Sequence, residues 1–171
     1  ALPFNKPDLL ETIRFFERIN NYLQSKGKLF VVLPLPDKNS LFSEFLPQSV
    51  KLVGPSRFEQ FLTESSDASF NLVSVLPILK QSKAEGEEIY FQTDSHWNCR
   101  GAWFAYKALM NKIRKMGYEG GKELVESEIL ISRPENINTD LVGNLLNLKG
   151  YIDEPFGYKC RMKQKVDIKA T

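Results

Sequence analysis

Histidine, cysteine and long apolar runs are scarce in this sequence. The scarcity of histidine and cysteine argues against a metal site, and the scarcity of apolar runs argues against a membrane-spanning segment. Its 171 residues include one histidine, His96, and two cysteines, Cys99 and Cys160. Because no short cysteine–histidine spacing is present, we predict no metal site, and we expect no cofactor. No apolar run is long enough to cross a bilayer, so we expect no transmembrane segment in this chain.

Charge of one sign is also scarce. The 23 Lys and Arg nearly balance the 21 Asp and Glu, which argues against a nucleic-acid partner. The richest basic patch, residues 159–165, fits a solvated strand or loop, and contact with an anionic surface is the alternative reading. The two cysteines allow one disulfide, and two reduced, buried thiols are equally compatible with the count.

The length fits one domain over residues 1–171, and no internal repeat or low-complexity segment divides it. The apolar share of 42% is that of a folded globular protein and not of a disordered tail. The chain begins with Ala1 and has no signal peptide, so we expect a sequence trimmed at both ends.

Two long helices and one strand stand out from the hydrophobic periodicity. Apolar residues recur at three- and four-residue steps between Asn5 and Gly27, which predicts an amphipathic helix. The apolar run 29–33 predicts a buried strand, and a second helix is expected from about Gly101 to about Met116. This order predicts an α/β fold, a doubly wound and mostly parallel sheet.

Shorter elements are expected between these long ones. Residues 56–61 fit a short helix with Ser56 as its N-cap, and residues 76–80 fit a brief helical turn. Short strands are expected at 70–75 and 88–91, and a helix or strand near 124–131.

Chemistry concentrates at residues 89–102, where an apolar segment runs into polar residues and then into a helix. Asp94 and His96 stand two residues apart there. In acyl transfer by a serine, a histidine moves the proton and a carboxylate orients the imidazole. The alternative is structural, because Thr93, Asp94, Ser95 or Asn98 would each serve as the N-cap of the following helix.

The block Thr-Asp-Ser-His-Trp-Asn-x-x-Gly-Ala at 93–102 resembles the signature of the alginate O-acetyltransferase family and its DHHW relatives. Weaker matches follow the family order: the strand at 29–33 with Pro-Leu-Pro-Asp-Lys after it, Leu-Pro at 46–47, Leu-Pro at 76–77 and Asp-Leu-Val-Gly-Asn-Leu-Leu at 140–146. The resemblance therefore runs from about residue 9 to about residue 155.

The resemblance implies an SGNH-hydrolase-like α/β fold in an extracytoplasmic protein of the periplasm or cell surface. It implies movement of acetyl groups onto or off an exported polysaccharide, with the acetyl donor delivered by a membrane partner. Asp94 matches the family's catalytic acid and His96 its base. Trp97 would pack against the loop or stack on a sugar.

Two further residues are candidates for substrate binding. Lys38, expected beyond the carboxyl end of the first strand, is placed to meet an anionic sugar, and solvation is its alternative. Asn144 is a candidate oxyanion donor, although a Gly-Asn turn also explains it through backbone geometry.

The sequence departs from the family at the nucleophile. No Gly-Asp-Ser block follows His96, and the serines after it are Ser127 and Ser132. Either the chain stops before the nucleophile strand, or residues are missing, or the protein is a natural variant without the serine. Three functions remain: an O-acetyltransferase or acetylesterase, a catalytically inactive polysaccharide-binding module on the same fold, and a lipid or peptide esterase.

Overall fold

The computed structural model describes residues 3–50, 53–118, 123–132, 141, 145 and 159–163. The chain divides into two compact units, residues 1–77 and residues 78–171. Compact units of this kind also occur within one domain, so a single domain over residues 1–171 stays a prediction. Asn144 and most of the 140–146 segment lie outside the described residues.

The first unit opens with the long predicted helix, α1 (Lys6–Ser25). Asn5 is its N-cap, and the Asn5 side-chain oxygen accepts a hydrogen bond from the Asp8 backbone N–H at 2.8 Å. The chain leaves the helix through Gly27, whose φ of 66° is a left-handed conformation that glycine adopts without strain. The expected helix is confirmed, with both of its ends.

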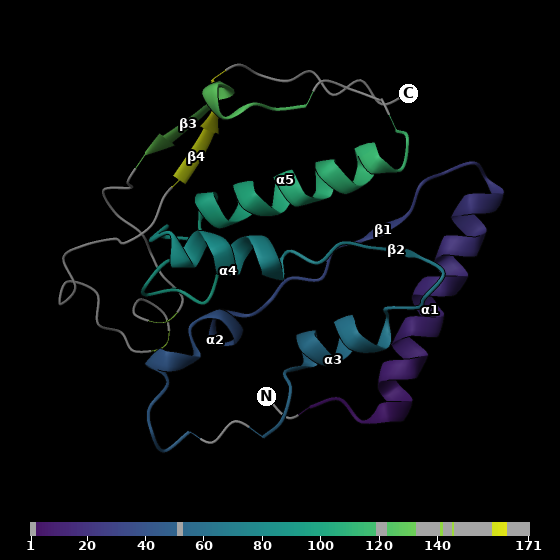
Figure 1. Ribbon diagram of the computed structural model, residues 1–171, viewed down its shortest axis with the longest axis horizontal. Helices are drawn as coiled ribbons and strands as arrows, with labels where there is room; N and C mark the ends of the chain where they lie inside the picture. Colours follow the sequence, from purple (N-terminus) through teal and green to yellow (C-terminus); the bar gives the residue numbers. More distant parts are fainter. Residues whose placement is uncertain are drawn as a thin grey trace. The chain divides into compact units, whose positions relative to one another are not determined.

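Two short strands lie beside this helix in the first unit (Figure 1). β1 (Val31–Val32) and β2 (Asn71–Leu72) pair in parallel, with Val31 opposite Asn71. Both strands were predicted, but each is shorter than its apolar run. The core of this unit joins residues of α1, β1 and α3 with the residue that precedes β2; its buried members are Leu9, Ile13, Val32, Phe61 and Phe70.

Between the two strands the chain forms α2 (Lys38–Leu41), the 3-10 turn η1 (Ser43–Phe45) and α3 (Arg57–Glu64). Ser56 caps α3, since its hydroxyl accepts from the Glu59 N–H and the Glu59 carboxylate accepts from the Ser56 N–H. The predicted short helix and its cap are confirmed.

The helix α4 (Leu76–Ala84) begins at the last residues of the first unit and continues into the second. It is longer than the brief turn expected, and Gly86 follows it with a φ of 84°. The second long helix, α5 (Cys99–Lys115), begins two residues before the predicted start and ends as predicted before Gly117.

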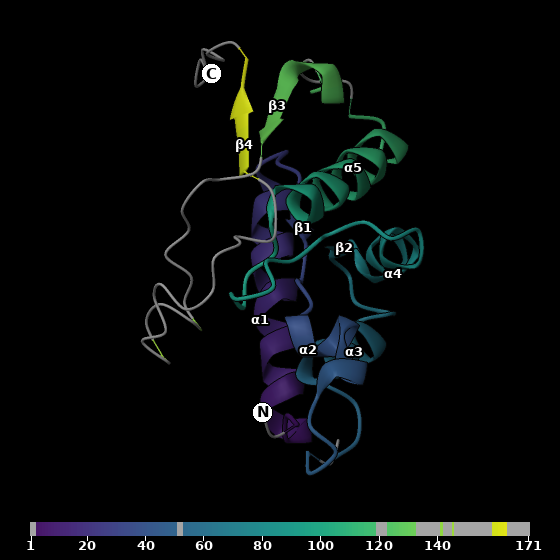
Figure 2. The same cartoon turned by 90° about the vertical axis from the view of Figure 1, so that its left-hand side faces the viewer.

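After α5 come the 3-10 turn η2 (Glu126–Glu128), β3 (Ile129–Ser132) and β4 (Lys159–Met162). β3 and β4 form an antiparallel pair, and Figure 2 shows their arrows side by side in opposite directions. The basic patch therefore begins as a strand. The strand expected at 88–91 is wrong: only Tyr90 makes a single bridge, to Trp97.

Candidate active site

Asp94 and His96 are joined through one carboxylate oxygen. Asp94 Oδ1 lies 2.6 Å from His96 Nδ1 and accepts the His96 backbone N–H at 2.8 Å. The Asp94 side chain is 13% exposed and the His96 side chain 74% exposed. The carboxylate is thus held inside the protein surface while the imidazole extends toward solvent.

This contact determines which imidazole nitrogen carries the proton. A carboxylate oxygen accepts, so Nδ1 must donate, and in the neutral ring the lone pair is then on Nε2. A histidine in this tautomer accepts a proton at Nε2, and its carboxylate partner stabilises the imidazolium that results. The arrangement suits a general base followed by a general acid.

Asn98, and not Asp94, caps the helix that follows. The Asn98 side-chain oxygen accepts from the backbone N–H groups of Arg100, at 2.8 Å, and Gly101, at 3.2 Å. Because the N-cap position belongs to Asn98, the capping explanation of Asp94 falls away. The Asp94 carboxylate is instead directed to His96.

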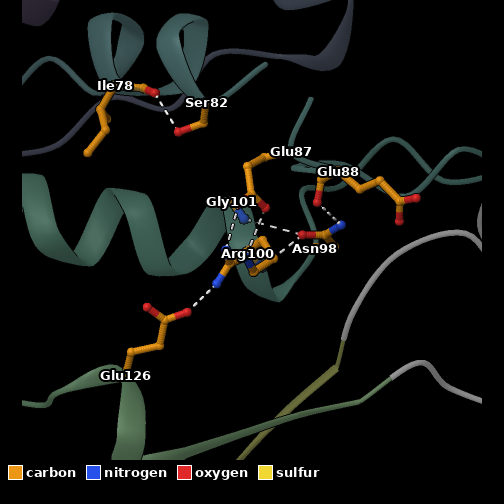
Figure 3. A network of polar contacts seen from close by, with 8 residues as sticks. All are labelled: Ile78, Ser82, Glu87, Glu88, Asn98, Arg100, Gly101 and Glu126. Atoms are coloured by element: carbon orange, nitrogen blue, oxygen red, sulfur yellow. Dashed lines mark hydrogen bonds and ion pairs between the residues drawn. The ribbon is translucent and has the colours of Figure 1, made fainter. Parts of the chain in front are cut away.

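Asn98 also fixes the loop to the segment before it. It is 2% exposed, and its amide donates to the Glu88 carbonyl at 2.6 Å, as Figure 3 shows. Gly101 lies against the same segment, where a Cβ atom would stand 2.3 Å from the Ile89 carbonyl oxygen. Glycine at position 101 is therefore required by close backbone approach, and the Asn-x-x-Gly spacing has a packing cause.

The loop between these anchors is closed by backbone pairing. Phe91 N–H donates to the His96 carbonyl at 3.3 Å, and Asn98 N–H donates to the Ile89 carbonyl at 3.1 Å. Trp97 is partly buried and forms the antiparallel bridge with Tyr90. Trp97 thus contributes its backbone to the closure, and both roles expected of its side chain, packing and sugar stacking, stay predictions.

An ion-pair network flanks the loop. Arg100 donates from Nε and Nη2 to the two carboxylate oxygens of Glu87, at 3.1 and 2.7 Å, and from Nη1 to Glu126 (Figure 3). Hydrogen bonding from Arg100 lowers the pKa of Glu87 below its ordinary range. Hydrogen bonding to Glu87 raises the pKa of Arg100, so its charge is permanent.

A disulfide joins Cys99, the first residue of α5, to Cys160 of β4 across 61 positions of sequence. The Cα atoms are 5.6 Å apart, a separation typical of disulfides. Of the two readings that the cysteine count allowed, the structure has the bonded one. The bond attaches the β3–β4 pair to the residue that directly follows Asn98.

The other predicted residues are placed differently. Lys38 is the first residue of α2 in the first unit, where it is partly buried, and its role stays a prediction. Asn144 lies outside the described residues, so its oxyanion role also stays a prediction. Ser127 lies in η2 and Ser132 in β3, both exposed, as expected of serines outside a nucleophile turn.

Sequence reasoning missed three features of this site. The sequence alone did not assign Asn98 as the cap of α5 and the partner of the Glu88 carbonyl. It also did not assign Arg100 as the ion-pair partner of Glu87 and Glu126, or the bond between the two cysteines. Asn98 carried a signal as one of four possible caps before α5, and the two cysteines allowed a bond without predicting it.

Within the described ranges no group of three His, Cys, Asp or Glu side chains is arranged to hold a metal ion. No helix in the described part of the chain is long and apolar enough to span a membrane.

Comparison with known proteins identifies the family of this fold. The family model described as "SGNH hydrolase-like domain, acetyltransferase AlgX" matches residues 3–165. A curated relative, the probable alginate O-acetylase AlgJ of Pseudomonas putida, is 23% identical over 112 residues, which cover 65% of this chain and 29% of the relative.

Solved structures show the same fold at low sequence identity. The O-acetyltransferase domain of Pseudomonas putida AlgJ superposes with a TM-score of 0.68 at 18% identity, covering 89% of this chain and 54% of that one. Bacillus cereus PatB1 gives a TM-score of 0.67 at 20% identity, covering 95% and 53%.

The chain spans about half the length of these solved relatives and less than a third of the curated one. The predicted SGNH-hydrolase-like α/β fold is confirmed by both kinds of match. Since the family model covers nearly the whole sequence, this chain belongs to the SGNH hydrolase-like acetyltransferase family that includes AlgX.

Proposed function

We propose that Asp94 and His96 are the acid–base pair of a serine-dependent O-acetyl transfer to an exported polysaccharide. The observation that carries this proposal is the double engagement of Asp94 Oδ1, which holds the backbone N–H and the Nδ1 of His96 at once. One oxygen thereby fixes both the position of the residue and the tautomer of its ring.

The proposed reaction uses a serine outside these 171 residues, since no Gly-Asp-Ser block follows His96 in this sequence. Its hydroxyl attacks the carbonyl carbon of the acetyl donor while His96 Nε2 takes the hydroxyl proton. The tetrahedral intermediate collapses, and the imidazolium returns that proton to the departing oxygen of the donor. A sugar hydroxyl then attacks the acetyl-serine, with His96 again taking the proton and giving it back to the serine oxygen. Asp94 stays ionised and stabilises each imidazolium.

Two observations support an extracytoplasmic polysaccharide as the acceptor. The curated relative carries the name probable alginate O-acetylase, and alginate is a polysaccharide. The bond between Cys99 and Cys160 suits an oxidising compartment such as the periplasm or cell surface. In this proposal the acetyl donor comes from a membrane partner, as the family resemblance implies.

The exposure of His96 makes a chemical-rescue experiment possible. The full-length protein is incubated with p-nitrophenyl acetate beside His96→Ala, and nitrophenol release is followed. We expect a loss of about 10³-fold or more in the variant. Added imidazole should restore part of the rate above the protein-free blank, because removing a side chain that is 74% exposed leaves an accessible space beside Asp94.

A second candidate function is a polysaccharide-binding module without turnover. The observation that favours it is the absence of a Gly-Asp-Ser block between His96 and Thr171. This candidate would be established, and acetyl transfer rejected, by two results together. Wild type and His96→Ala would both release nitrophenol at the background rate, and the chain would be retarded in a gel that contains polysaccharide. Rescue by imidazole would reject the binding module, since rescue requires a catalytic histidine.

A further inference from the structure

Arg100 joins the two ends of the loop that carries Asp94 and His96. Glu87 precedes the loop, and Arg100 follows it in the first turn of α5. The guanidinium binds the Glu87 carboxylate with two hydrogen bonds, at 3.1 and 2.7 Å. A bidentate pair of this kind fixes angle as well as distance, so it holds the entry and the exit of the loop in one geometry.

The third contact of Arg100 extends the clamp to the following element. Nη1 donates to Glu126 in η2, which leads directly into β3. The Arg100 side chain is 19% exposed and that of Glu87 31%, so their pair is partly buried, whereas the Glu126 side chain is 55% exposed and extends this pair to the surface. One side chain therefore connects the segment before the loop, the helix after it and the start of the β3–β4 pair.

Helix stability alone does not account for an arginine at this position. Arg100 lies in the first turn of α5, where the helix dipole disfavours a positive charge, and this turn contains no acidic residue. The last turn, where positive charge is favourable, already holds Lys112, Arg114 and Lys115. A positive charge at this position destabilises the helix, and the contacts with Glu87 and Glu126 offset that loss of stability.

We propose that Arg100 is a positioning residue for His96: its clamp on Glu87 and Glu126 holds the loop in the geometry in which Asp94 meets Nδ1. The proposal rests on the proposed function for its catalytic consequence. Its structural consequence is independent of turnover, since it concerns which nitrogen of His96 carries the proton.

The single histidine of this sequence makes that consequence measurable. In protein prepared without a polyhistidine tag, ¹⁵N-labelled imidazole gives one Nδ1 and one Nε2 signal, and both belong to His96. The ¹⁵N shifts separate a nitrogen that carries a proton from one that carries a lone pair. The ¹⁵N spectra are recorded on the 171-residue chain, in which His96 is the one histidine, and kcat and KM for p-nitrophenyl acetate are determined on the full-length protein.

The test compares Arg100→Gln with Arg114→Gln. Arg114 is a matched control because it lies on the same helix and pairs with Glu123, at 3.0 Å, while its side chain is 59% exposed. In Arg100→Gln we expect the two ¹⁵N shifts to move toward the averaged values of a solvated imidazole. We expect kcat to fall about 10-fold with KM within about twofold, because only orientation is lost.

Arg100→Lys should recover part of kcat, since it keeps the charge and loses the bidentate geometry. Wild-type shifts and wild-type kcat in a folded Arg100→Gln would overturn the proposal, as would equal changes in Arg114→Gln. If Arg100→Gln does not fold, Glu87→Gln removes one side of the clamp and is judged by the same two readouts. Shifted ¹⁵N signals in a protein without turnover would support the clamp and reject acetyl transfer.

Discussion

Asp94 and His96 share one oxygen: Asp94 Oδ1 accepts the backbone N–H of His96 at 2.8 Å and lies 2.6 Å from its Nδ1. The first bond fixes where the histidine backbone lies, and the second fixes which way the ring turns. Because the residues are two positions apart, one loop supplies both groups of this unit.

The Asp94→Asn variant should reverse the tautomer of His96. An asparagine side chain keeps the size of aspartate, and its amide can donate to Nδ1, which moves the imidazole proton to Nε2 and removes the base. We expect kcat of the full-length protein to fall by about 10⁴-fold with little change in stability. The ¹⁵N shifts of the single histidine check the tautomer directly, and unchanged shifts in Asp94→Asn would contradict this account.

The Asn98→Ala variant should destabilise the chain more than loss of an ordinary cap. It removes two hydrogen bonds at the start of α5 and leaves the Glu88 carbonyl without the bond at 2.6 Å in a partly buried site. We expect a loss of about 2–3 kcal/mol in the free energy of unfolding.

Ser56→Ala, which removes the capping hydroxyl of α3, is the comparison variant for Asn98. Its loss should be about 1 kcal/mol, because both bonds of the Ser56 hydroxyl, from the Glu59 N–H and to the Glu59 carboxylate, stay within the capping box and neither holds another segment. Urea unfolding measures both free energies. An Asn98→Ala loss no larger than that of Ser56→Ala would show that the anchor to Glu88 contributes nothing.

Stability should fall in acid partly through Glu87. Arg100 lowers the folded-state pKa of Glu87 below its ordinary value of 4.5. A carboxyl with a lowered folded-state pKa adds stability above its unfolded-state pKa. That stability is lost as the pH falls from about 4.5 through the lowered value.

The Glu87→Gln variant should therefore be less stable than wild type near neutral pH, by about 1 kcal/mol. Below pH 4.5 the difference should shrink, because wild type then protonates Glu87. Urea unfolding across this pH range measures the effect. If the free energies of unfolding of wild type and Glu87→Gln change in parallel with pH, the ion pair with Arg100 does not contribute to acid sensitivity.

The disulfide should be a large contributor to stability. Closing a loop between residues 61 positions apart restricts the unfolded chain by about 4 kcal/mol in the chain-entropy description. The double variant Cys99→Ser, Cys160→Ser should therefore unfold at a clearly lower urea concentration than oxidised wild type. Reduced wild type should match the double variant. Coincident unfolding curves for oxidised and reduced wild type would contradict the prediction.

Periodicity and capping residues predicted the helices well, and the reason is local. Asn5 and Ser56 cap α1 and α3 through bonds to residues three positions away, so the sequence contains the whole interaction. The apolar segment 88–91 was interpreted as a strand from composition alone. A strand needs a partner, and in this loop the pairing is limited to the Tyr90–Trp97 bridge.

The contact between Asp94 and His96 was predictable from their spacing, but the groups that hold the loop in place were not. Asp94 and Asn98 are both good capping residues, and sequence alone does not say which one caps α5. Arg100 and Glu87 stand 13 positions apart with no periodic signal between them. Cys99 and Cys160 were compatible with a bond or with two thiols. Each of these outcomes depends on the tertiary structure around the loop.

Activation of a serine by His96 is tested most directly by covalent labelling of the full-length protein with a sulfonyl fluoride, followed by peptide mass spectrometry. Such reagents sulfonylate a serine that a neighbouring histidine activates. We expect one labelled serine in wild type, with labelling abolished in His96→Ala and retained in Arg114→Gln. No labelled serine, or equal labelling in wild type and His96→Ala, would show that His96 activates no nucleophile.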